Sequence, residues 1–357
     1  MKMIHCSDIH LDSRMEQNLT AAQARERNAE ILATFSRMVD YALEQDVAAV
    51  LLAGDLFDTQ RVSAATAGFV LDRIRRAPQL DFYYLRGNHD ESADVFRDLE
   101  LPGNFRTFGR DWTSYPCGGA VVTGLELDRE NWQTMYDGLC LEKDAVNIVM
   151  LHGQIHTQSG EDMIALPKLK NKNIDYLALG HIHSFQAGQL DDRGNWCYCG
   201  CLEGRGFDEC GEKGFVLLDI QEGKVKTRFV PFAARTLQEV DVDITDLVSV
   251  DQILRALEDA SRDLGSRDLV KFVLRGGYTL QTQKDLTFLK KMLEGRFYFA
   301  KIKDASSLKI DPESYVNDIS LKGEFIRLVM ASDRPREEKE KIILLGIRAL
   351  SGEEVAL

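Results

Sequence analysis

Histidine, aspartate and asparagine residues gather directly after short apolar segments in the first 183 residues of the chain. The sequence has seven histidines, and five of them follow such a segment next to Asp, Asn or Gly. Imidazole nitrogens combined with carboxylate and amide oxygens suit Mn²⁺, Fe²⁺ or Zn²⁺ better than Ca²⁺ or an iron–sulfur centre. The clusters are Asp8-x-His10, Gly54-Asp55-x-x-Asp58, Gly87-Asn88-His89-Asp90, His152-Gly153 and Gly180-His181-x-His183.

Each cluster has an ordinary structural explanation when it is taken alone. Asp and Gly favour turns, and a single histidine is more often a packed or surface side chain than a ligand. Five clusters of this kind after five strands are hard to explain as independent turns. The side chains are sufficient for two ions, and an anionic group must lie between two dications about 3.5–4 Å apart. His5, inside the first strand, and His156, in a Gly/Ser-rich loop, are interpreted as structural or solvent-exposed.

The alternation of apolar runs and amphipathic stretches predicts the elements that position these clusters. In residues 1–233 it predicts helices at 22–44 and 64–76 and strands at 2–6, 47–53, 82–85, 146–151, 174–179, 194–201, 214–220 and 225–231. The early βαβα order implies a layered sheet with helices outside. In open α/β sheets the ligand sites form at the carboxyl ends of the strands, so we expect the clusters to meet at one edge.

The pattern of elements restarts after a boundary near residues 231–235. Strands are predicted at 237–242, 269–274 and 297–302, and helices at 250–264, 283–294, 320–330 and 336–350. We therefore predict three parts: residues 1–233 with the histidine clusters, a small α/β module at 234–310, and a helical C-terminal segment at 311–357.

Composition and charge limit the class of protein. The chain has 357 residues, 44% hydrophobic and 28% charged, which is typical of a soluble globular protein. No apolar run approaches the roughly 20 residues of a membrane span, and the N-terminus does not resemble a secretory signal, so a cytoplasmic location is expected. The net charge of −13 argues against a protein that simply coats nucleic acid. The charge does not exclude an enzyme that acts on nucleic acid, because bound metals and local basic strips can offset it.

The seven cysteines are interpreted as reduced thiols, because their number is odd and no signal peptide precedes them. One group could form a soft-metal site, but its C-x-C-x-C spacing differs from that of common zinc sites. Packed small thiols are the preferred interpretation of this group, which comprises Cys197, Cys199, Cys201 and Cys210.

Taken together, the clusters resemble the signature of the calcineurin-like metallophosphoesterases in order and spacing, over roughly residues 1–230. Within that superfamily the chain resembles the SbcD-type nucleases of DNA double-strand-break repair. It is also similar to the bacterial YhaO-type DNA repair exonuclease subfamily in MKMIHCSDIHLD, AGDLFD, residues 202–215 and LKGEFIRL at 321–328. The resemblance implies an α/β fold: a layered β-sandwich flanked by helices, followed by a small α/β domain that caps DNA and a helical tail.

The resemblance also implies a role for each residue of the clusters. His89 would contact the scissile phosphate and stabilise or protonate the leaving oxygen. Asp58 would orient the metal ligands without binding a metal itself. The implied ligands are Asp8, His10 and His183 for one ion, Asn88, His152 and His181 for the other, and Asp55 as the bridge. One departure is Cys199-Gly200-Cys201, where relatives tend to carry Pro-Gly-Ser.

The activity implied by the resemblance is a Mn²⁺-dependent DNA exonuclease or endonuclease that hydrolyses phosphodiester bonds with a hydroxide activated by two metal ions. The alternative is a phosphatase or a small-molecule phosphodiesterase of the same superfamily. The additional module at 235–304 favours the nuclease, and the acidic charge favours the alternative. A non-catalytic interaction subunit is disfavoured, because the ligand set and His89 are both present.

DNA and protein partners are expected as well. In relatives the C-terminal region docks an SMC-like ATPase, so an SbcC-type subunit is the implied partner, and a homodimer through the helices near 22–44 and 64–76 is also implied. No membrane contact is expected. The candidate DNA contacts, each of which could instead be a solvated surface residue, are Arg14, Arg61, Arg205, Lys213 and the run Lys168, Lys170 and Lys172.

Overall fold

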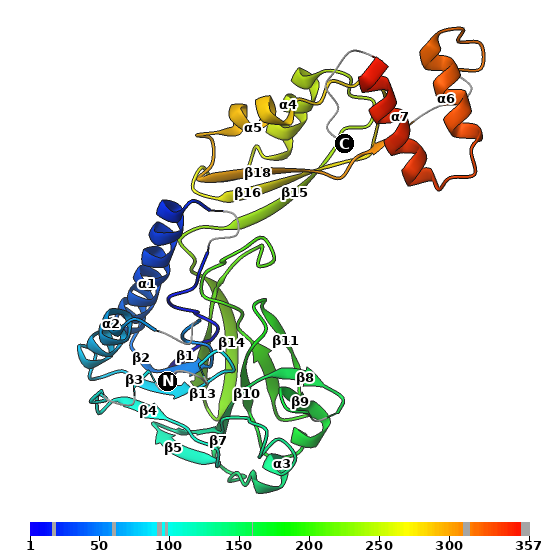
Figure 1. Cartoon of the computed structure of the whole chain (residues 1–357). Helices are drawn as coiled ribbons and strands as arrows, with labels where there is room; N and C mark the ends of the chain where they lie inside the picture. The colour runs from blue at the N-terminus through cyan, green and yellow to red at the C-terminus, as the bar shows by residue number, and fades with distance from the viewer. Residues whose placement is uncertain are drawn as a thin grey trace. The chain divides into compact units, whose positions relative to one another are not determined.

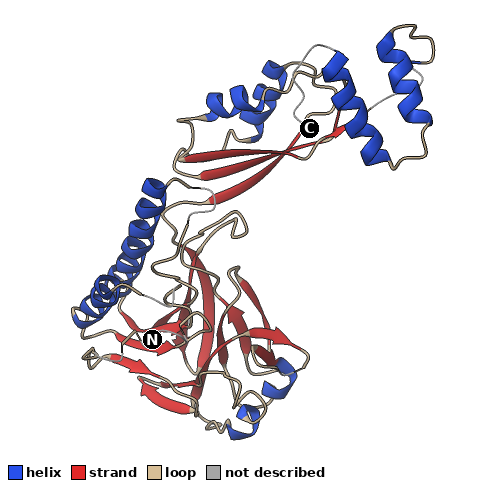
Figure 2. Cartoon of the chain, in the orientation of Figure 1, coloured by secondary structure: helices blue, strands red, loops and turns tan. Residues whose placement is uncertain are grey.

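The structure is a computed structural model that describes residues 1–15, 19–58, 62–90, 95–96, 99–158, 160–309 and 315–350. The chain divides into two compact units, Met1–Leu237 and Gln238–Leu357 (Figure 1). The first unit contains all five histidine and aspartate clusters. Figure 2 shows that strands dominate this unit, whereas the second unit combines a small sheet with several helices.

A six-stranded sheet in the first unit carries the first three clusters. Its strand order is β14-β13-β1-β2-β3-β4, with β1 to β4 parallel and β13 antiparallel to both β1 and β14. The bounds are β1 (Lys2–Cys6), β2 (Val47–Ala53), β3 (Asp81–Leu85), β4 (Phe105–Thr107), β13 (Gly214–Gln221) and β14 (Lys224–Pro231).

A second six-stranded sheet carries the remaining two clusters. Its strand order is β11-β12-β10-β7-β6-β5, with β6, β7, β10 and β12 parallel. A short ribbon of β8 (Gln154–His156) and β9 (Met163–Ala165) follows β7. The bounds of the six strands are β5 (Thr113–Cys117), β6 (Ala120–Gly124), β7 (Val146–His152), β10 (Tyr176–Gly180), β11 (Gln186–Gln189) and β12 (Asn195–Tyr198).

The two sheets pack face to face, and helices cover their outer faces. Met3 and Leu51 of one sheet share a buried cluster with Ile148 and Ala178 of the other. Helices α1 (Ala21–Glu44) and α2 (Ala64–Arg75) cover the first sheet, and α3 (Met135–Gly138) and the 3₁₀ helix η1 (Leu166–Leu169) cover the second. This arrangement confirms the predicted sandwich flanked by helices.

The five clusters follow strands of both sheets, so the expectation of a single sheet edge is wrong. β1, β2 and β3 belong to one sheet, and β7 and β10 belong to the other. Strand β2 packs directly against β7 and β10, which brings the carboxyl ends of the two sets together. Periodicity could not separate the sheets, because strands covered on both faces are continuously apolar.

The second unit contains its own small hydrophobic core. Strands β15 (Leu237–Asp243), β16 (Leu269–Arg275) and β18 (Phe299–Asp304) form a sheet in the order β15-β16-β18, and α4 (Val250–Ala260) and α5 (Leu286–Leu293) share one buried cluster with it. The ribbon of β17 (Gly277–Tyr278) and β19 (Ser307–Leu308) shares a separate apolar cluster with α6 (Leu321–Ala331) and α7 (Arg336–Leu350). No helix among the described residues is long and apolar enough to cross a membrane.

Candidate metal centre

The clusters lie in tight turns at the carboxyl ends of β1, β2, β3, β7 and β10. Four of the seven expected ligands have a left-handed backbone: Asp8 at φ 51°, His10 at 50°, Asp55 at 52° and His181 at 101°. Residues other than glycine rarely adopt positive φ, and such residues concentrate at functional sites. The backbone of these turns is therefore strained, and contacts with the surrounding structure must stabilise it.

Two glycines allow the imidazole of His152 to pack between the sheets. A Cβ atom at Gly180 would lie 1.9 Å from the carbonyl oxygen of Ala53 and 2.7 Å from Nδ1 of His152. A Cβ atom at Gly54 would lie 2.1 Å from the same Nδ1. With glycine at both positions, Nδ1 of His152 reaches the Ala53 carbonyl at 2.9 Å, and Nε2 points to the other side of the ring.

Three expected ligands converge at the end of β1. Nε2 of His10 lies 3.2 Å from Nε2 of His183, and that His183 nitrogen lies 3.7 Å from Oδ1 of Asp8. One ligand atom from each of the three residues lies within 4.8 Å of the other two. The Asp8 carboxylate also accepts the backbone N–H of His181, which fixes its orientation.

The other expected ligands converge beside this group. Oδ1 of Asn88 lies 3.0 Å from Nε2 of His152 and 3.2 Å from Nδ1 of His181. Oδ2 of Asp55 lies 3.3 Å from Nε2 of His152 and 3.9 Å from Nε2 of His10. One carboxylate oxygen thus faces both groups, which is the position expected of a bridging ligand.

Carboxylates behind the first group determine which nitrogens are available. Nδ1 of His183 donates to Oε1 of Glu209 at 2.7 Å. Nδ1 of His10 is buried, and Oδ1 of Asp58 lies 3.0 Å away, close but less well aligned than the His183–Glu209 hydrogen bond. A neutral imidazole that carries its proton on Nδ1 presents a lone pair on Nε2. Two such lone pairs facing each other at 3.2 Å suit a shared cation, so the donor set fits a divalent metal.

The electrostatics of the second group also favour positive charge between the ligands. Burial alone would lower the pKa of His152, but the charge of Asp55 and the hydrogen bond to it raise the pKa to about 9. Burial opposes ionisation of Asp55 as well, yet the neighbouring histidines and the backbone N–H of His89 hold its pKa well below the ordinary value. A metal ion would supply the positive charge that this pair favours.

His89 lies at the open side of the centre. Its side chain is 44% exposed, and its Nδ1 lies 3.4 Å from Oδ1 of Asp58. The ring packs edge-on against His10, with centroids 4.9 Å apart. His10, Asp58 and His89 also satisfy the distances of a metal-binding group. However, the Nδ1 atoms of both histidines face the same Asp58 oxygen, at 3.0 Å for His10 and 3.4 Å for His89, so attraction to one carboxylate accounts for this grouping.

Sequence analysis missed Glu209, which holds His183, and placed Arg205 among the candidate DNA contacts. The Arg205 side chain is only 16% exposed, and its guanidinium lies between Asp58 and Glu209. Burial alone would raise the pKa of Asp58, but the contacts with His10 and Ser13 and the charge of Arg205 lower it to about 2. In the sequence, Glu209 and Arg205 are marked only by the resemblance of residues 202–215 to the YhaO-type subfamily. That resemblance does not by itself indicate a role beside the metals.

The other candidate DNA contacts lie in different places. Arg14 is exposed in the loop after His10, and Arg61 lies outside the described residues. Lys213 is buried and donates to the carbonyl of His183 at 2.6 Å. The structure does not bring the lysine run to the turns that carry the clusters. Lys168 lies over the ring of Tyr136, Lys172 donates to the Tyr136 carbonyl, and Lys170 and Lys172 lead into the amino end of β10.

The remaining histidines and the cysteine group do not belong to the two ligand groups, although Sγ of Cys201 lies 3.5 Å from the carbonyl oxygen of His183 and 3.9 Å from Oε2 of Glu209. His5 is buried, with Nδ1 2.8 Å from the Tyr176 hydroxyl, and burial lowers its pKa to about 3. His156 is exposed. Cys197, Cys199 and Cys201 are buried free thiols and Cys210 is partly buried, and no cysteine among the described residues belongs to a candidate metal group.

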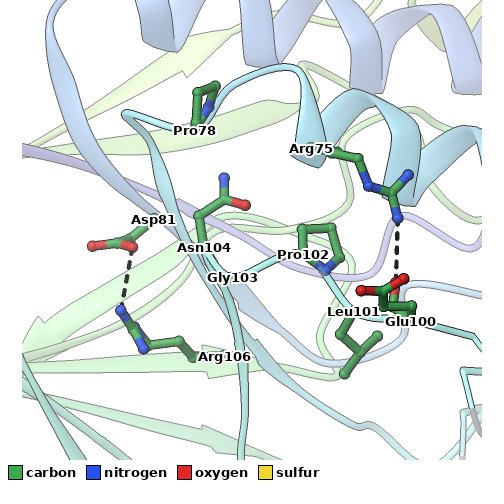
Figure 3. Close-up of a pocket in the computed structure, with 9 residues that line it drawn as sticks. All are labelled: Arg75, Pro78, Asp81, Glu100, Leu101, Pro102, Gly103, Asn104 and Arg106. Atoms are coloured by element: carbon green, nitrogen blue, oxygen red, sulfur yellow. Dashed lines mark hydrogen bonds and ion pairs between the residues drawn. The ribbon is translucent and has the colours of Figure 1, made fainter.

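A separate pocket of about 620 Å³ lies near the amino ends of β3 and β4 (Figure 3). Its arginines are engaged within the chain: Arg106 lies 3.8 Å from Asp81, and Arg75 donates to the Glu100 carbonyl. The Asn104 amide donates to three backbone carbonyls. Because it lies at the opposite ends of the strands from the clusters, this pocket is not part of the candidate metal centre.

Comparison with known proteins places the chain in a family. The model of the calcineurin-like phosphoesterases matches residues 1–185. Among similar proteins, the uncharacterized metallophosphoesterase YhaO of Bacillus subtilis is 25% identical over 77% of this chain and 72% of its own. The DNA double-strand break repair protein Mre11 of Haloferax volcanii is 28% identical over 77% of this chain and 61% of its own. The SbcD component of the Escherichia coli nuclease SbcCD is 25% identical over 74% of this chain and 76% of its own. The chain therefore belongs to the calcineurin-like phosphoesterase family, whose members are metal-dependent hydrolases with a dinuclear metal centre.

Proposed function

We propose that the chain is a divalent-metal-dependent DNA nuclease that hydrolyses phosphodiester bonds in double-strand-break repair. The observation that carries this proposal is the position of Asp55, whose Oδ2 faces His10 on one side and His152 on the other. Two groups of ligands around one carboxylate suit a pair of ions rather than a single structural ion. The names of the Mre11 and SbcCD relatives support DNA as the substrate.

The residues that would hold the ions divide as the geometry groups them. Their oxygen and imidazole donors suit Mn²⁺, which is the metal we propose. When bound, two such ions would lower the pKa of water and withdraw charge from a phosphoryl group. The proposed ligands are Asp8, His10 and His183 for the first ion, Asn88, His152 and His181 for the second, and Asp55 for both.

His89 is the proposed catalytic residue beside the metals. Its Nδ1 lies 3.4 Å from Oδ1 of Asp58 and its side chain is 44% exposed, so we expect Nε2, on the other side of the ring, to be the nitrogen that meets the substrate. From that position Nε2 can donate to a phosphoryl oxygen or protonate the leaving oxygen. It follows Asn88 directly, so the two neighbouring side chains would serve the metal and the phosphate separately.

A phosphatase or small-molecule phosphodiesterase is the second candidate, and one feature favours it. A cavity of about 360 Å³ opens beside Asn88 and is lined by three arginines and five carboxylates. Arg86 forms a fork with Glu126, and Arg110 is paired with Asp128 and Glu130. This wall carries more negative than positive charge, which disfavours a polyanion more than a compact substrate.

The partners and the roles of the later segments are also proposals. We propose DNA as substrate, an SMC-like ATPase as a partner of residues 311–357, a capping role for residues 234–310, a homodimer, and a cytoplasmic location. The docking role is supported by exposed apolar side chains of α6, with Leu321 71% and Leu328 64% exposed. The two leucines are seven positions apart and so lie on one face of the helix, and a cluster of exposed apolar side chains is typical of a protein-binding surface.

The experiment that tests the proposed activity measures two substrates together. Labelled linear and hairpin duplexes with Mn²⁺ are compared with bis(p-nitrophenyl) phosphate, and the Asp8→Asn variant serves as the inactive control. A nuclease should cleave the duplexes, and Asp8→Asn should abolish both activities. If the wild type hydrolyses only the small diester, even at low salt, the small-molecule phosphodiesterase replaces the nuclease.

A further inference from the structure

We propose that Arg205 is a positioning residue that sets the geometry of the first metal site through two carboxylates. The inference rests on the proposed metal centre and concerns how that centre is built. Arg205 contacts none of the ligand atoms that would face a metal. It acts on the carboxylates of Asp58 and Glu209, which lie behind His10 and His183.

The Arg205 guanidinium contacts both carboxylates at once. Its Nη1 lies 3.1 Å from Oδ1 of Asp58, and its Nη2 lies 2.8 Å from Oε1 of Glu209. Nε lies 3.2 Å from the same Glu209 oxygen, and the Arg205 backbone N–H donates to the other at 2.7 Å. A planar guanidinium with fixed donors determines the relative position of two such acceptors, which a single ammonium group does not.

Each carboxylate in turn faces Nδ1 of one proposed ligand. Asp58 Oδ1 lies 3.0 Å from His10, and Glu209 Oε1 lies 2.7 Å from His183. On the far side of these rings the two Nε2 atoms face each other at 3.2 Å. The two rings are therefore connected through two carboxylates and the guanidinium of Arg205, whose Nη2 also lies 3.4 Å from Nδ1 of His183.

Burial and charge make this arrangement sensitive to the loss of Arg205. The side chains of Arg205 and Asp58 are 16% and 17% exposed, and that of Glu209 is 4% exposed. Without the guanidinium, two poorly solvated carboxylates would lie side by side with no cation between them. Removing one member of a buried charge network leaves uncompensated charge, so we expect the carboxylates and their histidines to move apart.

The loop that carries Arg205 is anchored independently of the metal centre. Arg27 of α1 donates from Nη2 to the Gly204 carbonyl at 3.0 Å and lies 3.2 Å from Oε2 of Glu203. The Thr34 hydroxyl donates to the other Glu203 oxygen at 2.6 Å. Arg27 and Glu203 are both 1% exposed. These contacts hold the backbone beside Arg205 in place, so the guanidinium is already oriented before a metal binds.

The test compares Mn²⁺ binding and hydrolysis in Arg205 variants of the full chain. Electron paramagnetic resonance of a Mn²⁺ titration gives the number of ions and their affinities. Arg193→Ala is the matched control, because Arg193 makes a similar fork with Asp175 and donates to two backbone carbonyls in the same unit but touches no proposed ligand.

Arg205→Ala should weaken one of the two Mn²⁺ sites by about 10–100-fold, the effect typical of removing a group that orients metal ligands. Arg205→Lys should lie between Arg205→Ala and the wild type, and Arg193→Ala should match the wild type. Hydrolysis of bis(p-nitrophenyl) phosphate by Arg205→Ala should fall at limiting Mn²⁺ and recover at saturating Mn²⁺. A defect that metal restores is not expected of a residue that only contacts DNA.

Unchanged Mn²⁺ affinities in Arg205→Ala, with DNA cleavage reduced and small-diester hydrolysis intact, would overturn the inference in favour of a DNA contact. If Arg205→Ala does not fold, Arg205→Lys and Glu209→Gln decide instead, and wild-type affinities at both sites in both variants would overturn it. If the wild-type chain itself binds no Mn²⁺, the proposed metal centre fails, whatever the variants do.

Discussion

His10 and His183 face each other through their Nε2 atoms at 3.2 Å, although 173 positions separate them in the chain. One follows β1 of the first sheet and the other follows β10 of the second. With Nδ1 of each ring directed at a carboxylate, neither Nε2 offers a proton to the other. This close approach of two Nε2 atoms is unfavourable for two neutral rings alone and favourable around a cation. It therefore supports a metal ion at this site.

Replacing His89 should separate catalysis from metal binding. His89→Ala should keep both Mn²⁺ ions and lower turnover by about 10²–10⁴-fold, because general acid or transition-state contacts typically contribute that much. Parallel measurement of bound Mn²⁺ and of phosphodiester hydrolysis checks this. His156→Ala, at another exposed histidine, is the control and should behave as the wild type. Loss of metal together with activity would assign His89 to the ligand set instead.

Much of the candidate site could be predicted from the sequence, because its ligands belong to short motifs directly after strands. Asp8 and His10 share one turn, and His181 and His183 share another. Glu209 and Arg205 could not be assigned in this way. They reach His183 and Asp58 from a separate loop, and only the tertiary structure shows those contacts.

The fold was predictable where an element buries a clear apolar pattern and less so elsewhere. The strand Val47–Ala53, buried along almost all of its length, forms with the expected bounds, and so does the helix Arg336–Leu350, which buries Ile343. The edge strand Thr113–Cys117 was not predicted, because it contains Pro116 and is mostly exposed or half-buried. The assignment of the motif strands to two sheets depends on packing between the sheets, which the local pattern does not encode.

Adding a methyl group at Gly180 should damage the centre. The new Cβ would lie 1.9 Å from the Ala53 carbonyl oxygen and 2.7 Å from the His152 ring, so Gly180→Ala should lower the free energy of unfolding by about 1–3 kcal/mol or more and reduce Mn²⁺ binding. Gly68→Ala is the matched control, because Gly68 lies on the exposed side of α2 with nothing within 4 Å. That variant should be stabilised by up to about 1 kcal/mol. Thermal unfolding of both variants gives the comparison, and equal melting temperatures would contradict it.

Acid should weaken the first unit partly through Glu30. Burial would raise the pKa of Glu30, but hydrogen bonds from Arg235 and Arg27 and their charges lower it below its ordinary value. A lowered pKa in the folded state contributes stability above the unfolded-state pKa, and this contribution disappears as the pH falls through the folded-state pKa.

Glu30→Gln should therefore be less stable than the wild type at neutral pH, and the difference should shrink in acid. Urea unfolding between neutral and acidic pH measures it. Glu222→Gln, in the exposed turn between β13 and β14, is the control and should follow the wild-type profile. A constant difference between Glu30→Gln and the wild type across the pH range would contradict the role of this ion pair.

The salt dependence of DNA affinity should show which residues of the first unit contact DNA. Each phosphate contact lowers the slope of log affinity against log salt by about 0.9. Arg14 is exposed in the loop after His10, so Arg14→Ala should remove roughly one contact from the slope. Joint replacement of Lys168, Lys170 and Lys172 should change it less, because Lys170 and Lys172 lead into the amino end of β10. The opposite ranking in a duplex-binding titration would place DNA on the other side of the unit.

We propose that Asp55 joins two groups of ligands into one dinuclear centre. Elemental analysis of the chain reconstituted with Mn²⁺ and freed of excess metal tests it most directly, with Asp55→Asn prepared in parallel. The wild type should retain close to two equivalents of Mn²⁺ per chain, and Asp55→Asn should retain fewer than the wild type. A wild-type value near zero, or a full complement of metal in Asp55→Asn, would contradict a dinuclear centre joined by Asp55.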